Sequence, residues 1–281
     1  MNELISAFFS YAFLSRALTA GILISLCAAL LGVSLVLKNY ALIGDGLSHV
    51  GFGALTIAAA ANLAPLAVAV PVVVAAAFLL LRLRGRGAIR GDSAIALLST
   101  AALALGVLVS SVCGMNTDLS AYLFGSILSM SSSDVVLSAV LCGIVLVLYI
   151  VFYNKIFTVT FDESFARATG THTGFYDSLL AVLTAVTVVL GMRLMGTLLI
   201  SSLIIFPSLS AMRVCRRFKS VVTVSAVISV VCVVVGLAAS YSFSTPAGAS
   251  VVAANVAVFA VFALAGAVLM RRRRRRMLEE K

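Results

Sequence analysis

Charged side chains are scarce in this sequence. Asp, Glu, Lys and Arg make up 11% of the 281 residues, whereas ordinary soluble domains contain roughly 25%. Hydrophobic residues make up 62%, so a soluble fold of this length would lack the polar surface that covers a core. The apolar residues also form long runs, and a helix of about 20 such residues crosses the hydrocarbon core of a bilayer. The composition therefore excludes an ordinary soluble protein and predicts an all-α membrane protein.

The short motifs of common enzymes and nucleotide-binding proteins are also missing. The sequence has no Walker A motif, no HExxH and no GxSxG, and it contains only two histidines. Any energy from ATP must therefore come from another chain, and we expect a protein that is not itself an enzyme. The five cysteines show no CxxC spacing and lie in or beside apolar segments. We interpret them as small packing residues rather than as disulfides or zinc ligands.

The apolar runs predict a polytopic bundle of eight to nine transmembrane helices in a single domain that covers residues 1–281. The count depends on whether a segment of small residues, from about 43 to 61, crosses the membrane fully. A short amphipathic piece, Leu4 to Leu14, precedes the first span. The remaining predicted spans cover roughly 17–37, 65–81, 93–113, 135–152, 175–192, 196–212, 220–241 and 247–270.

The basic residues lie in short clusters between the apolar runs and in one C-terminal tail, although the formal net charge is +10. That placement is typical of membrane topology signals rather than of a nucleic-acid-binding surface. If Lys38 and the clusters at 82–90, 155–167, 213–219 and 271–281 share one side, that side holds 18 of the 20 basic residues. The positive-inside rule assigns this side to the cytoplasm. We therefore expect a multi-pass protein of the cell (inner or cytoplasmic) membrane whose C-terminal tail, 271–281, is cytoplasmic.

Asp45 and His49 form the first candidate site, because they stand at positions i and i+4 of a predicted helix and project from one face. A carboxylate oxygen and an imidazole nitrogen together suit Zn²⁺ or Mn²⁺. An Asp inside the bilayer costs roughly 2.5–3.5 kcal/mol, so it normally faces a polar cavity or a partner. The same position also allows Asp45 to cap the helix N-terminus while His49 packs. Small residues around the pair leave room either for an ion path or for close helix approach: Gly44, Gly46, Ser48, Gly51 and Gly53.

A second candidate lies in the longest cytoplasmic loop. Thr160 and Glu163 have the spacing of a capping box, and Gly170 lies where a C′ glycine would end a helix. The pattern predicts a short helix of about nine residues, 161–169, outside the membrane. Such a helix is either a docking element for another protein or a solvated surface helix.

A third stretch, residues 196–208, places Ser201, Ser202 and Pro207 within an apolar span. The two hydroxyl groups could line a pathway, and the proline could kink the helix. Ordinary helix packing accounts for the same residues, so these three are candidates only.

Several segments from about Leu18 to Leu269 match one pattern when they are taken in order. They are Gly44-Asp45-Gly46-Leu47-Ser48-His49, Gly91-Asp92-Ser93-Ala94-Ile95, Tyr122-Leu123-Phe124-Gly125, Asp134, Asp162-Glu163, Ala166-Arg167-Ala168-Thr169-Gly170, Gly196-Thr197-Leu198-Leu199, Pro207 and Pro246-Ala247-Gly248. Together they resemble the metal-ion ABC transporter permease family, the membrane-spanning subunits of zinc and manganese importers. The chain departs from some members directly after the histidine, at Val50-Gly51-Phe52-Gly53.

The resemblance implies an ATP-driven importer of a divalent transition-metal ion, zinc first and manganese second, in which Asp45 and His49 coordinate the ion in transit. It implies a homodimer bound to two cytoplasmic ABC ATPase subunits and supplied by an extracytoplasmic metal-binding protein. The chain itself would carry no covalently bound cofactor and would use ATP only through these partners. The resemblance also implies that the helix at 161–169 is a cytoplasmic coupling helix, whose ATPase-coupling residues are Asp162, Glu163, Phe165, Arg167 and Gly170.

Three other functions are compatible with parts of the sequence. A permease for a metal chelate, such as a siderophore or cobalamin, would need a wider pathway without the inward Asp–His pair. An intramembrane enzyme would need a convergent acid/base set, and only one Asp–His pair is present. A channel or secondary transporter would be expected to show repeated broken helices, whereas this sequence predicts a capped cytoplasmic helix instead.

Overall fold

The computed structural model describes residues 12–85, 91–114, 124–125 and 132–279. Within these ranges the fold is helical and has no β-strand. The long helices are α2 (Ala12–Leu37), α3 (Ile43–Ala60), α4 (Pro65–Gly85), α5 (Gly91–Val112), α7 (Ser132–Val151), α10 (Thr173–Met195), α11 (Thr197–Val214), α12 (Phe218–Phe243) and α13 (Ala247–Glu279). Two short helices, α8 (Tyr153–Phe161) and α9 (Glu163–Ala168), lie between α7 and α10.

The predicted span count is confirmed. Among the described residues, eight helices are long and apolar enough to cross a membrane, and α3 is the remaining long helix. Of the amphipathic piece predicted at Leu4 to Leu14, residues 4–11 lie outside the described ranges, and the last three residues belong to α2.

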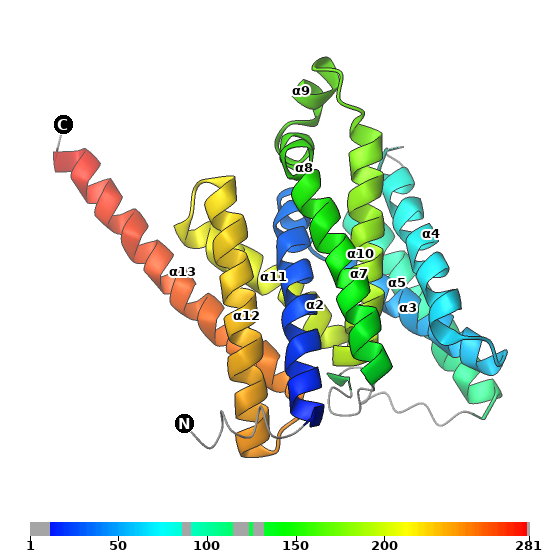
Figure 1. The fold of residues 1–281 in the computed structure, drawn as a ribbon. Helices are drawn as coiled ribbons and strands as arrows, with labels where there is room; N and C mark the ends of the chain where they lie inside the picture. The colour runs from blue at the N-terminus through cyan, green and yellow to red at the C-terminus, as the bar shows by residue number, and fades with distance from the viewer. Residues whose placement is uncertain (1–11, 86–90, 115–123, 126–131, 280–281) are drawn as a thin grey trace.

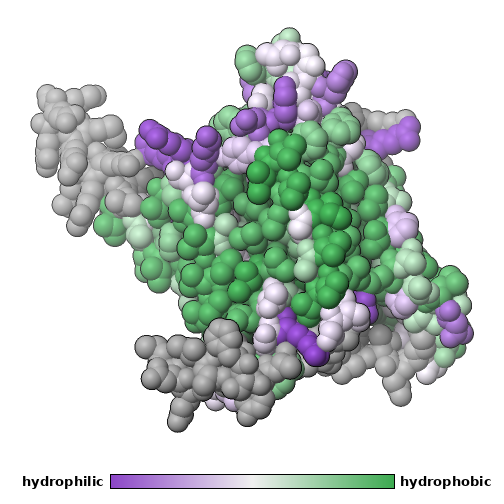
Figure 2. Space-filling view, viewed as in Figure 1, coloured by the Kyte–Doolittle hydropathy of each residue, from purple (hydrophilic) through white to green (hydrophobic). Residues whose placement is uncertain are grey.

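The two ends of the bundle differ in charge. Most of the long helices run side by side, whereas α13 leans away from the bundle; α9 lies at one end and the start of α2 at the other (Figure 1). A broad hydrophobic belt separates hydrophilic side chains at the α9 end from a smaller hydrophilic group at the opposite end (Figure 2). Lys38 follows α2 and Arg82 lies in the last turn of α4, both at the α9 end, whereas Arg193 lies near the far end of α10. This arrangement agrees with the charge asymmetry in the sequence.

The centre of the bundle is formed by α2 and α10. In α10, 72% of the apolar segment is buried, and in α2 67% is buried, compared with 17% in each of α5 and α13. Large apolar side chains on α5, such as Leu97 and Leu108, are exposed in the single chain. Such faces are stable against lipid or another apolar helix but not against water.

Glycines bring α3 unusually close to its neighbours. A Cβ added at Gly46 would lie 2.5 Å from Ile95 of α5, and one at Gly44 would lie 2.7 Å from Ile204 of α11. A Cβ at Gly53 would lie 2.7 Å from the backbone oxygen of Ala102. At these positions the small residues serve close helix approach, the second of the two roles predicted for them.

Candidate functional site

Asp45 and His49 lie in the first two turns of α3 and face each other. The His49 Nε2 atom is 3.6 Å from the Asp45 Oδ2 atom. The Asp45 side chain is 46% exposed and the His49 side chain is 18% exposed, so one carboxylate remains accessible in a single chain. The Ser48 hydroxyl donates to the backbone oxygen of Asp45 at 2.7 Å, which fixes the local backbone.

The capping alternative for Asp45 is wrong in this fold. Leu42 occupies the N-cap position of α3 and makes no side-chain capping hydrogen bond. Asp45 lies inside the first turn, where a carboxylate interacts favourably with the helix dipole. Its side chain instead contacts His49 and a residue of α11, so it is oriented toward other side chains rather than toward the free N–H groups of its own helix.

Ser201 is the α11 residue that joins the pair. Its hydroxyl donates to Asp45 Oδ1 at 3.4 Å, a long hydrogen bond between segments 156 positions apart. Ser202, although adjacent, is buried and donates to the backbone oxygen of Leu199. Pro207 is buried within α11. Of the three pathway candidates, the fold therefore brings only Ser201 to the Asp–His pair among the contacts of the described residues.

One chain supplies few donors for a metal ion. Within the described residues there is no group of three or more His, Cys, Asp or Glu side chains that could hold a metal. Asp45 and His49 offer one oxygen donor group and one nitrogen donor, whereas structural zinc sites take four ligands. By itself the pair would supply two of the four ligands of a tetrahedral site, and its Asp45 side chain is partly exposed.

The helix predicted at residues 161–169 is shorter than expected. It spans Glu163–Ala168, not 161–169, and its N-cap is Asp162, whose carboxylate accepts from the Phe165 N–H at 2.9 Å. Thr160 is not the cap, because α8 continues to Phe161. The rings of α8 explain this continuation: Phe157 packs against Phe218 of α12 with 4.9 Å between ring centroids. This packing keeps the end of α8 helical through the position of the apparent capping box.

The C-terminus of α9 ends as the sequence predicts. Gly170 has φ of +78°. The Gly170 N–H donates to the Arg167 oxygen at 3.0 Å, and the Thr171 N–H donates to the Ala166 oxygen at 2.9 Å. These two bonds make a Schellman motif, in which a glycine takes the left-handed position without strain.

The surface of α9 carries both apolar and charged side chains. Phe165, like Phe161 just before the helix, is exposed. Arg167 pairs with Glu163 at 2.5 Å on the same helix, and its Nε donates to the Thr173 hydroxyl of α10 at 3.1 Å. The helix thus projects from the bundle (Figure 1) while Arg167 links it to α10.

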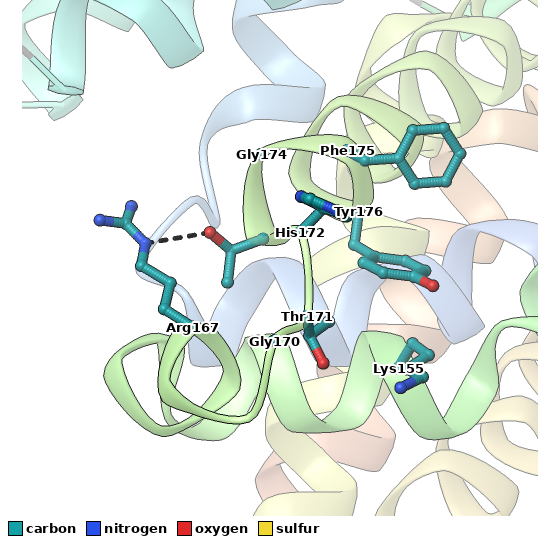
Figure 3. Close-up of a pocket in the computed structure, with 9 residues that line it drawn as sticks. Lys155, Arg167, Gly170, Thr171, His172, Gly174, Phe175 and Tyr176 are labelled. Carbon is teal, nitrogen blue, oxygen red and sulfur yellow. Dashed lines mark hydrogen bonds between the residues drawn. The ribbon is translucent and has the colours of Figure 1, made fainter.

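A cavity of about 910 Å³ lies beside α9, between the first turn of α8 and the start of α10 (Figure 3). Its lining includes the cations Lys155 and Arg167, the ring of His172, and the aromatic rings of Phe175 and Tyr176. Among the described residues that line it, none carries a carboxylate. This face is therefore suited to an acidic partner surface.

Two further ion pairs were not predicted from the sequence. Lys38 pairs with Asp177 near the start of α10, and both side chains are largely buried. Arg193 pairs with Asp134 of α7 at 3.3 Å, at the opposite end of the bundle. An acidic residue in an apolar helix signals that a partner exists, but the sequence does not identify the partner.

Comparison with known proteins identifies the family. A model of the ABC 3 transport family matches residues 10–266. The chain belongs to this family. The metal-ion ABC permease family predicted from the sequence is therefore confirmed, as is the all-helical membrane fold.

This ABC 3 permease has relatives along nearly its whole length. It is 29% identical to the manganese import system permease protein ScaB of Streptococcus gordonii, over 93% of this chain and 94% of ScaB. It is 30% identical to the high-affinity zinc uptake system membrane protein ZnuB of Haemophilus influenzae, over 86% of this chain and 94% of ZnuB. The structure of PsaBC from Streptococcus pneumoniae in complex with Fab includes a chain that matches with a TM-score of 0.83 and 30% identity, covering 93% of this chain and 94% of that one. The ABC 3 permease is thus a metal transporter permease.

Three of the sequence motifs meet at the end of the permease opposite α9. Gly125 and Gly196 have φ of +71° and +88°. A Cβ at Gly125 would lie 2.3 Å from the Met195 carbonyl carbon, and one at Gly248 would lie 2.6 Å from the Phe124 oxygen. The three glycines therefore allow backbone-to-backbone packing of segments that are far apart in the chain. Each motif contains a glycine, but nothing in the sequence indicates that these glycines share one junction.

Proposed function

We propose that this permease imports a divalent transition-metal ion and that Asp45 and His49 coordinate the ion in transit. The observation that carries this proposal is the 3.6 Å contact between the two side chains on a helix held by close packing. An oxygen and a nitrogen donor suit Zn²⁺ and Mn²⁺ alike. The pair lacks the closed donor set of a structural site, which suits an ion that must be released.

We further propose that the working unit is a homodimer in which two Asp–His pairs face one ion. Two copies would supply four donor side chains, the number that a tetrahedral site requires. The 46% exposure of Asp45 in the single chain supports this arrangement, because the carboxylate has an open side.

The energy source in this proposal is a pair of cytoplasmic ABC ATPase subunits that dock on α9. The exposed phenylalanines, the Arg167–Glu163 pair and the basic cavity beside them support a protein-binding role. The chain has no Walker A motif of its own. An extracytoplasmic metal-binding protein would deliver the ion at the other end of the bundle. The permease would lie in the inner (cytoplasmic) membrane, and its C-terminus would face the cytoplasm.

The preference for zinc over manganese is an expectation from the family resemblance. Relatives named for each of the two metals match this chain at nearly equal identity. Metal-resolved uptake therefore tests the ion. Proteoliposomes with the permease and its ATPase subunits, given the metal-binding protein, ATP and either Zn²⁺ or Mn²⁺, are expected to accumulate one of these ions. Asp45→Ala and His49→Ala should abolish accumulation while leaving assembly intact. Normal uptake in both variants would overturn the ligand assignment, and no uptake of either ion by the wild type would overturn the function.

A further inference from the structure

The Lys38–Asp177 pair connects two elements that carry the proposed function. Lys38 directly follows α2 and precedes α3, which bears Asp45 and His49. Asp177 lies in the second turn of α10, which begins just after α9. The Lys38 side chain is only 9% exposed and that of Asp177 is 22% exposed, so solvent screens this pair far less than the surface pair on α9. Each charge also complements its helix end, since a cation follows the C-terminus of α2 and an anion lies near the N-terminus of α10.

The joint between Lys38 and α3 is held by its own hydrogen bonds. The Asn39 N–H donates to the Val36 oxygen at 3.1 Å, and the Tyr40 N–H donates to the Leu35 oxygen at 2.8 Å. Asn39 has φ of +59°, so α2 ends in a Schellman motif with asparagine at the left-handed position. The Ile43 N–H then donates to the Tyr40 oxygen at 3.1 Å, where α3 begins. A displacement of Lys38 is therefore passed to α3 through a hydrogen-bonded turn rather than through a loose loop.

The other side of the pair leads to α9. Thr173 and Asp177 stand at i and i+4 on α10, so they project from one face. Thr173 accepts from Arg167 of α9 at 3.1 Å, and Asp177 pairs with Lys38. The contacts that connect α9 to α3 thus pass through adjacent residues on one face of α10, in its first two turns.

A cavity of about 600 Å³ borders the Lys38–Asp177 pair and the Arg167 side chain, and it leaves these side chains room to move. Its lining includes Lys38, Arg82, Glu163, Arg167 and Asp177. Charged side chains from the joint after α2 and from α4, α9 and α10 therefore line one cavity rather than packing against apolar residues. A packed core resists small displacements, whereas side chains around a cavity can change their arrangement.

We propose that Lys38 and Asp177 are positioning residues for transport: they transmit motion of α9, through Arg167, Thr173 and α10, to the helix that holds the metal. This inference rests on the proposed function, because it requires that an ATPase moves α9 and that α3 holds the ion. The pair itself touches neither ATP nor metal. Its effect is on the number of ions moved for each ATP hydrolysed.

The test compares uptake with hydrolysis in the reconstituted complex of permease and ATPase subunits, with Mn²⁺ and Zn²⁺ supplied separately. The main variant is K38M/D177L, which removes both charges and leaves neither one buried alone. We expect ATP hydrolysis within twofold of wild type and metal uptake reduced at least tenfold. Lys38→Arg retains the pair and should restore uptake to within twofold. Lys219→Met, the same change at an exposed lysine of α12 at the same end of the bundle, is the matched control and should leave both rates unchanged.

A second variant keeps the test decisive if K38M/D177L does not assemble. Thr173→Val preserves the side-chain shape but removes the acceptor for Arg167, and it should lower uptake for each ATP at least threefold. The inference is overturned, and the proposed function is left standing, if K38M/D177L shows the wild-type ratio of metal uptake to ATP hydrolysis. If the double variant is not obtained, the same result in Thr173→Val overturns it. Absence of ATP-dependent uptake of both metals by the wild-type complex overturns the proposed function and this inference with it.

Discussion

Helices α3 and α9 are held in place in opposite ways. In α3, 12 of 18 residues are buried, and glycines bring it close to α5 and α11. In α9, one of six residues is buried, and its shape depends on the Asp162 cap, the Gly170 end and one hydrogen bond from Arg167 to α10. The difference indicates that the proposed metal donors are positioned by packing on several sides. The proposed docking helix is positioned by its own termini and stays open to another protein.

The largest effect is expected from disturbing the packing of α3. Gly53→Ala places a Cβ 2.7 Å from the Ala102 backbone oxygen, which cannot rotate away. Overpacking of this kind costs about 1–3 kcal/mol, and we expect a lower thermal unfolding midpoint in detergent, followed by far-UV circular dichroism.

Gly143→Ala on α7 is the matched control for this prediction, because nothing lies within 4 Å of the added Cβ. Alanine is a better helix former than glycine by about 0.5–1 kcal/mol, so this variant should be as stable as wild type or more stable. Equal midpoints for the two variants would contradict the close packing of α3.

A smaller effect is expected from removing the cap of α9. Asp162→Ala removes the acceptor for the Phe165 N–H, and loss of an N-cap typically costs about 1 kcal/mol. Because α9 buries little, this change should weaken ATPase binding to the permease several-fold without lowering the unfolding midpoint. Asp162→Asn, which keeps a capping oxygen, should bind the ATPase as wild type does. Unchanged binding by Asp162→Ala would count against a role of α9 in docking.

How far the sequence predicts this fold is clearest at α8 and α9. The span positions follow from local apolar runs, so they agree with the helices to within a few residues. The Thr160–Glu163 spacing misplaces the start of α9, because this spacing is a local signal, whereas the contact of Phe157 with Phe218 at the end of α8 joins distant parts of the chain. Tertiary packing decided the boundary, and it cannot be predicted from a motif of four residues.

The candidate site was also predicted only in part. Asp45 and His49 are four residues apart, so helix periodicity brings them together. Ser201 is 156 positions from Asp45, and Asp177 is 139 positions from Lys38. These contacts depend on how separate helices pack. A single sequence shows which polar residues are present but not which of them pair.

The smallest effect is expected at Ser201. Removing a residue that orients a metal ligand commonly lowers affinity about 10-fold or more, but the bond from Ser201 to Asp45 is long, at 3.4 Å. Ser201→Ala should therefore weaken metal binding by less than about 10-fold, measured by titration of the purified permease with Mn²⁺ or Zn²⁺. The neighbouring Ser202→Ala, whose hydroxyl bonds only to Leu199 among the described contacts, should leave the affinity unchanged. Equal metal affinities for the wild type and Ser201→Ala would show that Ser201 does not contribute to the site.

The most direct test of the central claim is the amount of metal bound by the purified permease dimer, determined by mass spectrometry of the eluted ion. The account predicts one Zn²⁺ or Mn²⁺ for every two chains, and loss of that ion in both Asp45→Ala and His49→Ala with the dimer intact. One ion for each chain, or an ion that remains bound in both variants, would contradict a shared site built from two Asp45–His49 pairs.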